Sequence, residues 1–336
     1  MAAKTVCVTG AGGFVASWLV KLLLSKGYNV HGTVREPAGS KKYEHLQKLE
    51  GASENLTLFK ADLLNYESIL SAIAGCTAVF HVASPVPSTI VPNPQASLII
   101  YFFNVEVIEP AVQGTTNVLQ ACLETKVQRV VYVSSVSAIS IRPNMPKDKV
   151  IDESYWSDKD YCKKTQYTVL FWLSCKNVKF QSSRMVMNWY CYSKTEAEEQ
   201  ALDFGKRTGL DVSTTVNASS LVLPKLLKGG DSFENKTRWI VDVRDVVDAI
   251  LLVYEKPEAE RRYICTAHTI KTRDLVEKLR SIYPSYKYPS NFTEVDDYLR
   301  FSSDKLERLG WKYRSLEETL IDSVESYREA GLLQFE

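Results

Sequence analysis

Tyr190 and Lys194 form a Tyr-x-x-x-Lys pattern, a pair of residue types at a spacing that could do acid–base chemistry. On a helix, residues four apart lie on one face, so both side chains would meet the same site. A tyrosine hydroxyl has a pKa of about 10 in water, and a neighbouring ammonium favours its phenolate form and brings that pKa towards neutral pH. Ser135 ends the apolar run Val131–Ser135, and we expect its hydroxyl to point at a substrate carbonyl beside Tyr190. The three residues predict a catalytic trio, although Tyr190 and Lys194 could instead be ordinary helix-surface residues.

A glycine turn near the start of the chain predicts the phosphate-binding end of a dinucleotide site. The run Thr9–Ala16 reads TGAGGFVA, follows an apolar strand and begins a helix. Gly10 permits the tight turn, and Gly13 lets the backbone approach a pyrophosphate at the free N–H groups of the helix. An ordinary glycine-rich loop is the alternative, which the flanking strand and helix disfavour. The predicted cofactor contacts in this turn are Gly10, Gly12, Gly13, Phe14 and Val15.

The end of the second predicted strand indicates which dinucleotide is bound. An acidic residue about 20 positions after the turn would bind the ribose diol of NAD(H), whereas this chain has Arg35, followed by Glu36 and by Lys41 and Lys42. A guanidinium suits a dianionic 2′-phosphate through paired hydrogen bonds. The sequence therefore predicts NADP(H), whose oxidised nicotinamide ring would also favour the phenolate of Tyr190. Arg35 could instead be a solvated charge, with Glu36 on the diol.

Strands and helices alternate through the first two-thirds of the chain, which predicts an α/β fold with a doubly wound parallel sheet, a Rossmann fold. The predicted strands are Thr5–Thr9, Asn29–Val34, Leu56–Phe59, Ala78–Val82 and Arg129–Ser134. The predicted helices are Phe14–Ser25, Lys42–Leu49, Tyr66–Ile73, Val105–Glu124 and a long helix over 188–208. Two strand ends fit the adenine and ribose sides of the cofactor, and they contribute Asp62 and Leu63, and Val82, Ala83 and Ser84.

Beyond residue 212 the pattern loosens, and we expect a smaller C-terminal substrate domain. The predicted NADP-binding Rossmann domain covers 1–212 and the substrate-binding region 213–336, with segments around 238–266 returning to the Rossmann sheet. The strands expected there are Arg238–Val243 and Arg262–Thr266, and the helices are Val246–Tyr254, Thr272–Ile282 and Leu316–Ala330.

The composition is that of a soluble globular protein. A hydrophobic content of 45% and a net charge of +1 over 336 residues give no electrostatic case for nucleic acid or an anionic membrane. No apolar run approaches the roughly 20 residues that span a bilayer. Seven scattered cysteines predict reduced thiols in a cytoplasmic protein, and four dispersed histidines predict no metal centre.

Four segments together resemble the plant cinnamoyl-CoA reductase-like enzymes, which are extended short-chain dehydrogenases related to dihydroflavonol reductases. The segments are Val8–Trp18, His81–Pro85, Glu109–Thr115 and Asn188–Lys194, the last of which reads NWYCYSK. The resemblance implies Ser135, Tyr190 and Lys194 as the catalytic trio, Arg35 and Lys41 as ligands of the 2′-phosphate, and Asn117 as a helix asparagine that supports the lysine. It also implies NADPH-dependent reduction of a hydroxycinnamoyl-CoA thioester to an aldehyde, or of a related ketone or aldehyde.

The chain departs from that family pattern in three places. Segments 95–104 and 165–187 interrupt stretches that are close together in the family. A loop that lies beside the nicotinamide in the family is missing after Val212. Such departures, each bounded by intact family sequence, predict misplaced exon boundaries or true surface-loop variation. Two alternatives therefore stay open: a catalytically impaired NADP-binding protein, and a nucleotide-sugar epimerase or dehydratase, which Arg35 disfavours.

Three positions bear on the substrate. Enzymes of lignin synthesis carry a His-x-x-Lys pair and a downstream Arg for the CoA ester, and the aligned residues here are Val222, Lys225 and Thr272. Only the lysine matches, so Lys225 is the predicted substrate contact.

Overall fold

A computed structural model describes residues 3–37, 39–85, 104–143, 145, 149–165, 183–217, 223–230, 232–297 and 299–333. The chain divides into two compact units. The first comprises Met1–Met145, Ser154–Val216 and Val247–Tyr263, and the second Pro146–Glu153, Asn217–Val246 and Ile264–Glu336.

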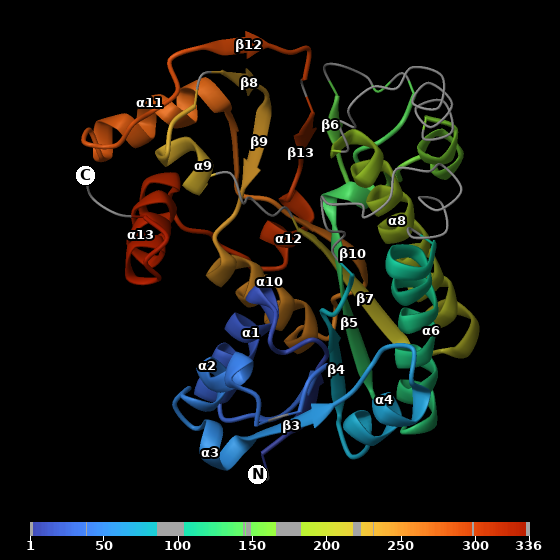
Figure 1. Cartoon of the computed structure of the whole chain (residues 1–336). Helices are drawn as coiled ribbons and strands as arrows, with labels where there is room; N and C mark the ends of the chain where they lie inside the picture. Colours follow the sequence, from blue (N-terminus) through green and yellow to red (C-terminus); the bar gives the residue numbers. More distant parts are fainter. Residues whose placement is uncertain are drawn as a thin grey trace. The chain divides into compact units, whose positions relative to one another are not determined.

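A seven-stranded sheet forms the centre of the first unit (Figure 1). Its strands are β1 (Thr5–Val8), β2 (Asn29–Val34), β3 (Leu56–Lys60), β4 (Ala78–His81), β5 (Arg129–Ser135), β7 (Asp211–Asn217) and β10 (Arg261–Cys265), in the order β10-β7-β5-β4-β1-β2-β3. Strand β1 pairs in parallel with β2 and β4, β2 with β3, and β4 with β5. All four residues of β4 and the middle five of β5 are buried, as expected for parallel strands covered on both faces. The predicted fold class is confirmed.

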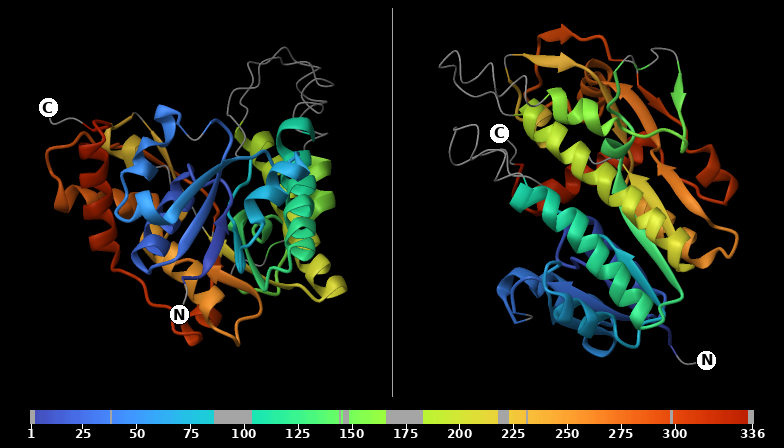
Figure 2. Two further views of the ribbon diagram at one scale, coloured as in Figure 1. Left: turned by 90° about the horizontal axis from the view of Figure 1, so that it is seen from below. Right: turned by 90° about the vertical axis from the view of Figure 1, so that its right-hand side faces the viewer.

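Helices cover both faces of this sheet (Figure 2). They are α1 (Phe14–Ser25), η1 (Lys41–Tyr43), α2 (Glu44–Gln47), α3 (Ala52–Asn55), α4 (Tyr66–Ile73), η2 (Asn104–Ile108), α6 (Glu109–Glu124), η3 (Val136–Ala138), α8 (Ser183–Thr208) and α10 (Val243–Glu255). On one face α4 packs on α6, and α6 packs on α8 (Figures 1 and 2). Helix α4 begins where Asn65 accepts a hydrogen bond from the Ser68 N–H at 3.0 Å, a side-chain cap that fixes the first turn.

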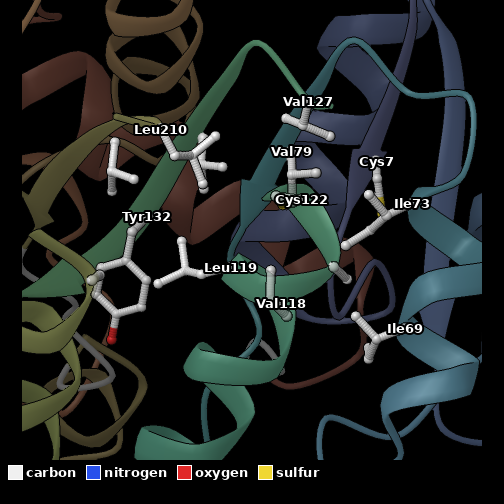
Figure 3. Packing of buried hydrophobic residues seen from close by; sticks show 14 of the residues in the cluster. Cys7, Ile69, Ile73, Val79, Val118, Leu119, Cys122, Val127, Tyr132 and Leu210 are labelled. Carbon is white, nitrogen blue, oxygen red and sulfur yellow. The ribbon is translucent and has the colours of Figure 1, made fainter. Parts of the chain in front are cut away.

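The core under these three helices draws residues from β1, β4, β5 and β7 (Figure 3). Cys7 and Val79 on the strands meet Ile73, Val118 and Leu119 on the helices. Tyr132 on β5 belongs to the same cluster. Its hydroxyl oxygen is the only oxygen or nitrogen atom on the side chains labelled in Figure 3. The tyrosine hydroxyl must therefore find its partners at the edge of this apolar core.

Arg129, the first residue of β5, ties three distant parts of the first unit together. Its Nε donates to Asp211 Oδ2 at 2.6 Å. Its Nη1 donates to the carbonyls of Val253, Tyr254 and Lys256 at 3.1, 3.1 and 2.6 Å, and Nη2 to that of Pro257 at 3.3 Å. The guanidinium thus satisfies carbonyls at the end of α10, which a helix leaves without partners of its own.

The second unit is built from three two-stranded sheets and short helices. The strand pairs are β13 (Arg300–Phe301) with β6 (Val150–Ile151), β11 (His268–Lys271) with β9 (Thr237–Ile240), and β12 (Phe292–Glu294) with β8 (Phe233–Asn235). The helices are α9 (Leu223–Leu227), α11 (Thr272–Ile282), α12 (Asp304–Arg308) and α13 (Leu316–Glu329). Leu226, Leu279 and Leu320 are buried completely in a core that joins α9, α11 and α13.

Several elements differ from their sequence-based prediction. Strand β10 joins the seven-stranded sheet, whereas β9 pairs with β11 and not with that sheet. The helix expected over Lys42–Leu49 is broken into η1 and α2, and the long helix begins at Ser183, five residues before its predicted start. Strand β7 has seven residues, the same length as β5, and it runs through Val212, after which the sequence analysis places the missing loop. The assignment of NADP binding to residues 1–212 and of substrate binding to residues 213–336 stays a prediction.

The first insert, except for Asn104, and the residues 166–182 of the second lie outside the described part of the chain. The last five residues of the second insert, 183–187, form the first turns of α8.

Candidate active site

The strand order of the sheet reverses at β1, and the carboxyl ends of β1 and β4 lie side by side there. Ligands of open α/β sheets bind at such a reversal. The glycine turn follows β1, and Val82–Ser84 follows β4. Thr9 joins the two loops, because its Oγ1 accepts hydrogen bonds from the Val82 and Ala83 N–H groups, each at 3.0 Å.

The glycine turn has the geometry that a bound pyrophosphate requires. Gly10 has a φ of +68°, and a Cβ there would lie 3.0 Å from the Ala83 Cβ, so a side chain would be both strained and crowded. Gly13 precedes α1 without a side-chain cap, which leaves the first N–H groups of this 12-residue helix without an acceptor. Phe14 is 72% exposed and Val15 is partly buried. Among the described residues the buried Ser84 hydroxyl has no partner, so the residues present fit a phosphate-bearing dinucleotide.

Gly12 has a role that its place in the glycine motif did not reveal. A Cβ on Gly12 would lie 2.5 Å from Tyr43 Cε1, so the glycine makes room for this buried ring. The Tyr43 hydroxyl accepts a hydrogen bond from the Glu36 N–H at 3.3 Å. Tyr43 therefore connects the glycine turn to the segment that carries Arg35.

Arg35 and Lys41 are both exposed at the end of β2 and at the start of η1. Glu36, the alternative ligand for a ribose diol, accepts hydrogen bonds from Lys42 Nζ at 2.7 Å and Ser40 Oγ at 3.2 Å. These contacts, with Lys42 first, lower the pKa of Glu36. The carboxylate of Glu36 is thus already engaged, while the guanidinium of Arg35 faces solvent.

Asn117 lies on α6 beside the segment that contains Asp62 and Leu63. Its amide Nδ2 donates to the Leu63 carbonyl at 2.8 Å, and its Oδ1 accepts from Gln113 at 2.9 Å. Among the hydrogen bonds of the described residues, Lys194 Nζ donates to Tyr132 and Val133, and the support of the lysine by Asn117 stays a prediction. Asp62 is exposed and holds its own loop, since its Oδ1 accepts from the Leu64 N–H at 2.9 Å.

His81, at the end of β4, is buried in a closed set of hydrogen bonds. Its Nδ1 lies 2.8 Å from Thr9 Oγ1 and its Nε2 lies 3.1 Å from Thr115 Oγ1. Thr9 Oγ1 already accepts two backbone N–H groups, so its proton goes to Nδ1 and the proton of the ring is on Nε2. Burial, with the Lys194 charge as the second cause, lowers the pKa of His81 to about 3, and the ring is neutral.

Ser135 and Tyr190 are brought together at the end of β5. Burial raises the pKa of Tyr190, and a hydrogen bond with Ser135 lowers it in part. The net rise differs from the lowering expected from a neighbouring lysine, because burial has the larger effect and the Lys194 ammonium donates its hydrogen bonds to other groups. Tyr190 therefore keeps its proton at neutral pH. Ser135 Oγ also accepts from the Ser137 N–H at 3.2 Å, which fixes its position in the turn.

Lys194 is 2% exposed and lies one helical turn after Tyr190. Its Nζ donates to Tyr132 Oη at 3.2 Å and to the Val133 carbonyl at 3.1 Å. Burial lowers the pKa of Lys194 to about 8, and the charge of Glu198 opposes that shift. Tyr132 and Glu198 were not singled out by the sequence reasoning, although Glu198 follows Lys194 by four residues and so lies on the same helix face.

Three comparisons place the chain among known proteins. The sequence model of the NAD dependent epimerase/dehydratase family matches residues 6–169, and that described as male sterility protein matches 96–267. Cinnamoyl-CoA reductase 1 of Petunia hybrida is 41% identical over 348 residues, which cover 98% of this chain and 94% of the relative. The chain belongs to the cinnamoyl-CoA reductase-like family of extended short-chain dehydrogenases. The family assignment expected from the four sequence segments is confirmed.

Two solved structures resemble this member of the family over nearly their whole length. Vestitone reductase from alfalfa (Medicago sativa) has a TM-score of 0.73 and 29% identity, with 98% of this chain and 99% of the other covered. Gre2 from Candida albicans, solved in complex with NADPH, has a TM-score of 0.76 and 26% identity, with coverage of 97% and 99%. The chain therefore shares the fold of both proteins.

The remaining predicted contact of this cinnamoyl-CoA reductase-like chain, Lys225, is exposed on α9 in the second unit. Val222, three residues before it, lies outside the described residues.

In the described part of the chain, no cluster of His, Cys, Asp or Glu is placed to hold a metal ion. The six cysteines described are buried and free. Among the same residues, no helix combines the length and apolar character needed to cross a membrane.

Proposed function

We propose that this chain is an NADPH-dependent reductase of a hydroxycinnamoyl-CoA thioester or of a related phenolic aldehyde or ketone. The observation that carries the proposal is the meeting of Ser135 with Tyr190 at the end of β5, one helical turn from the buried Lys194. The same unit of the protein holds the glycine turn that fits a dinucleotide. Arg35 supports the 2′-phosphate form of the cofactor, since Glu36 is engaged by Lys42.

Each residue of the trio has a chemical part in such a reduction. NADPH supplies the hydride to the carbonyl carbon when it is bound. Ser135 and Tyr190 donate hydrogen bonds to the carbonyl oxygen and stabilise its growing negative charge. Tyr190 then gives its proton to that oxygen, and Lys194 stabilises the phenolate that remains. A tyrosine whose pKa is raised by burial remains loaded with this proton at neutral pH, which suits reduction.

The product depends on the substrate class. An aldehyde or ketone that takes up one hydride and one proton becomes an alcohol. A thioester becomes a hemithioacetal, which expels the CoA thiol and leaves an aldehyde. Lys225 alone matches among the three expected CoA-ester positions, which is the reason to test both classes.

The full-length protein, mixed with NADPH and in turn with feruloyl-CoA, phenolic aldehydes and dihydroflavonols, tests the proposal. With one substrate class we expect the absorbance of NADPH to fall, and we expect chromatography to detect the reduced product of that substrate. In Tyr190→Phe, kcat should fall about 10²- to 10⁴-fold while the Kd for NADPH stays the same, because the ring is kept and only the hydroxyl group is lost. Tyr192→Phe, two residues along α8, is the matched control and should keep full activity.

Three outcomes would contradict the proposal. NADPH binding without turnover of any substrate would support an impaired cofactor-binding protein. Epimerisation of a nucleotide sugar without net consumption of NADPH would support the epimerase alternative. Full activity of Tyr190→Phe would overturn the assigned proton donor.

A further inference from the structure

The residues Tyr190, Lys194 and Glu198 follow one another at intervals of four on α8 and form a single stripe on that helix. Each contacts the end of β5: Tyr190 meets Ser135, Lys194 donates to Tyr132 and Val133, and Glu198 accepts from Ser134. The first two belong to the proposed trio. Glu198 is the third member of the stripe and has no part in the chemistry above.

Glu198 is fully buried and makes four hydrogen bonds. Its Oε1 accepts from Thr214 Oγ1 at 2.7 Å and from Arg262 Nε at 2.8 Å. Its Oε2 accepts from Ser134 Oγ at 2.7 Å and from Arg262 Nη2 at 3.1 Å. A two-point guanidinium contact and two hydroxyl donors fix the position of this carboxylate. The donors come from β5, β7 and β10, so one side chain of α8 binds three neighbouring strands.

Arg262 is as firmly placed as the carboxylate. It is 5% exposed, its Nη1 donates to the Tyr155 carbonyl at 2.6 Å, and its guanidinium lies 3.6 Å from the centre of the Trp156 ring. Burying such a pair is costly, and it contributes little to stability when compared with apolar residues of the same size. A role at the neighbouring site gives a physical reason for its presence.

The charges around Lys194 are few. His81 on β4 is neutral at physiological pH, since its pKa is about 3. Tyr132 on β5 and Tyr190 on α8 are neutral as well, because burial raises the pKa of both hydroxyls. Helix α6 contributes the uncharged Thr115 to this region. Glu198 is thus the negative group that acts on the ammonium, and Arg262 is the cation that faces it across the carboxylate.

We propose that Glu198, held by Arg262, is a positioning residue for this site: it fixes the Tyr190–Lys194 face of α8 against β5 and keeps Lys194 protonated. The inference rests on the proposed function for its consequence in catalysis. Its electrostatic part concerns Lys194 alone and can be measured without turnover.

The test follows the titration of Lys194 in the full-length protein. With isotope-labelled lysine Cε, the Lys194 signal is assigned by its loss in Lys194→Met. In the wild type we expect a midpoint near pH 8. Glu198→Gln removes the negative charge opposite Arg262, so the midpoint should fall by about one pH unit. The alkaline limb of kcat/KM should move in the same direction and by a similar amount.

Two further variants separate charge from packing. Arg262→Lys keeps both charges while losing the two-point contact, so it should leave the midpoint of Lys194 close to the wild-type value even where kcat falls. Glu198→Gln/Arg262→Met removes both charges and avoids a lone buried ion, which favours folding. It should still lower the midpoint, because Glu198 is gone.

If both Glu198 variants leave the Lys194 midpoint unchanged, the proposal is overturned, and a uniform fall in kcat at every pH would point to a structural role alone. A lowered midpoint in a protein that turns over no substrate would support the inference about Lys194 and reject the proposed function instead.

Discussion

Replacing His81 with glutamine should make the protein less sensitive to acid. His81 is buried and neutral between Thr9 and Thr115, and its pKa is about 3 in the folded protein against the ordinary histidine value of 6.5. Between pH 6.5 and pH 3 His81 therefore binds a proton in the unfolded chain and not in the folded one. The free energy of unfolding falls as the pH falls through this range. One pKa unit corresponds to about 1.36 kcal/mol, so roughly 3 kcal/mol should be lost from this group between pH 7 and pH 4.

Urea unfolding at a series of pH values measures the effect. Glutamine offers one acceptor and one donor for the two threonine hydroxyls but does not titrate. The free energy of unfolding of His81→Gln should therefore fall less steeply between pH 6.5 and pH 4 than that of the wild type, whatever its value at pH 7. His45→Gln, at an exposed site on α2, is the control and should follow the wild-type slope. Identical slopes for wild type and His81→Gln would refute the argument, because the carboxylates common to both proteins would then explain all acid loss.

Two predictions concern the cofactor end of the site. Arg35→Ser should weaken NADPH binding about ten- to a hundredfold, the worth of one or two charged hydrogen bonds, and leave NADH binding unchanged; fluorescence titration of both cofactors measures this, and an equal loss for both would exclude contact with the 2′-phosphate. Gly12→Ala should also weaken NADPH binding, since its methyl group would lie 2.5 Å from the Tyr43 ring. The additional change Tyr43→Leu should restore part of that affinity, and no recovery would mean that the methyl group disturbs the turn itself.

The glycine turn and the catalytic pair were predictable because each is local. Gly10 needs its positive φ within a four-residue turn, and Tyr190 and Lys194 share a face through helical spacing alone. Buried parallel strands are likewise predictable from composition, because they are runs of β-branched residues. Such features depend on interactions between residues that are close in sequence.

The partners of Lys194 were not predictable in the same way. Tyr132 and Val133 lie more than 60 positions upstream, and which groups face the ammonium depends on how α8 packs on β5. The hydrogen bond from Asn117 to the Leu63 carbonyl shows the same limit, since it joins residues 54 positions apart. Strand β9 was expected in the main sheet because its pattern fits any half-buried strand, and its pairing with β11 is set by tertiary contacts.

The hydrogen bonds of Arg129 have a consequence for the order in which the protein is made. Its carbonyl acceptors begin 124 residues further along the chain, at Val253, and β10, the edge strand of the same sheet, is later still. At about 5–20 residues per second, a ribosome takes roughly 6 to 25 s to supply them. During that time Arg129, at the start of β5, has none of its carbonyl acceptors. The sheet also lacks β10, the strand that pairs with β7 at its edge. The first unit is therefore completed only near the end of synthesis, and a chain that stops before residue 253 lacks the contacts that close it.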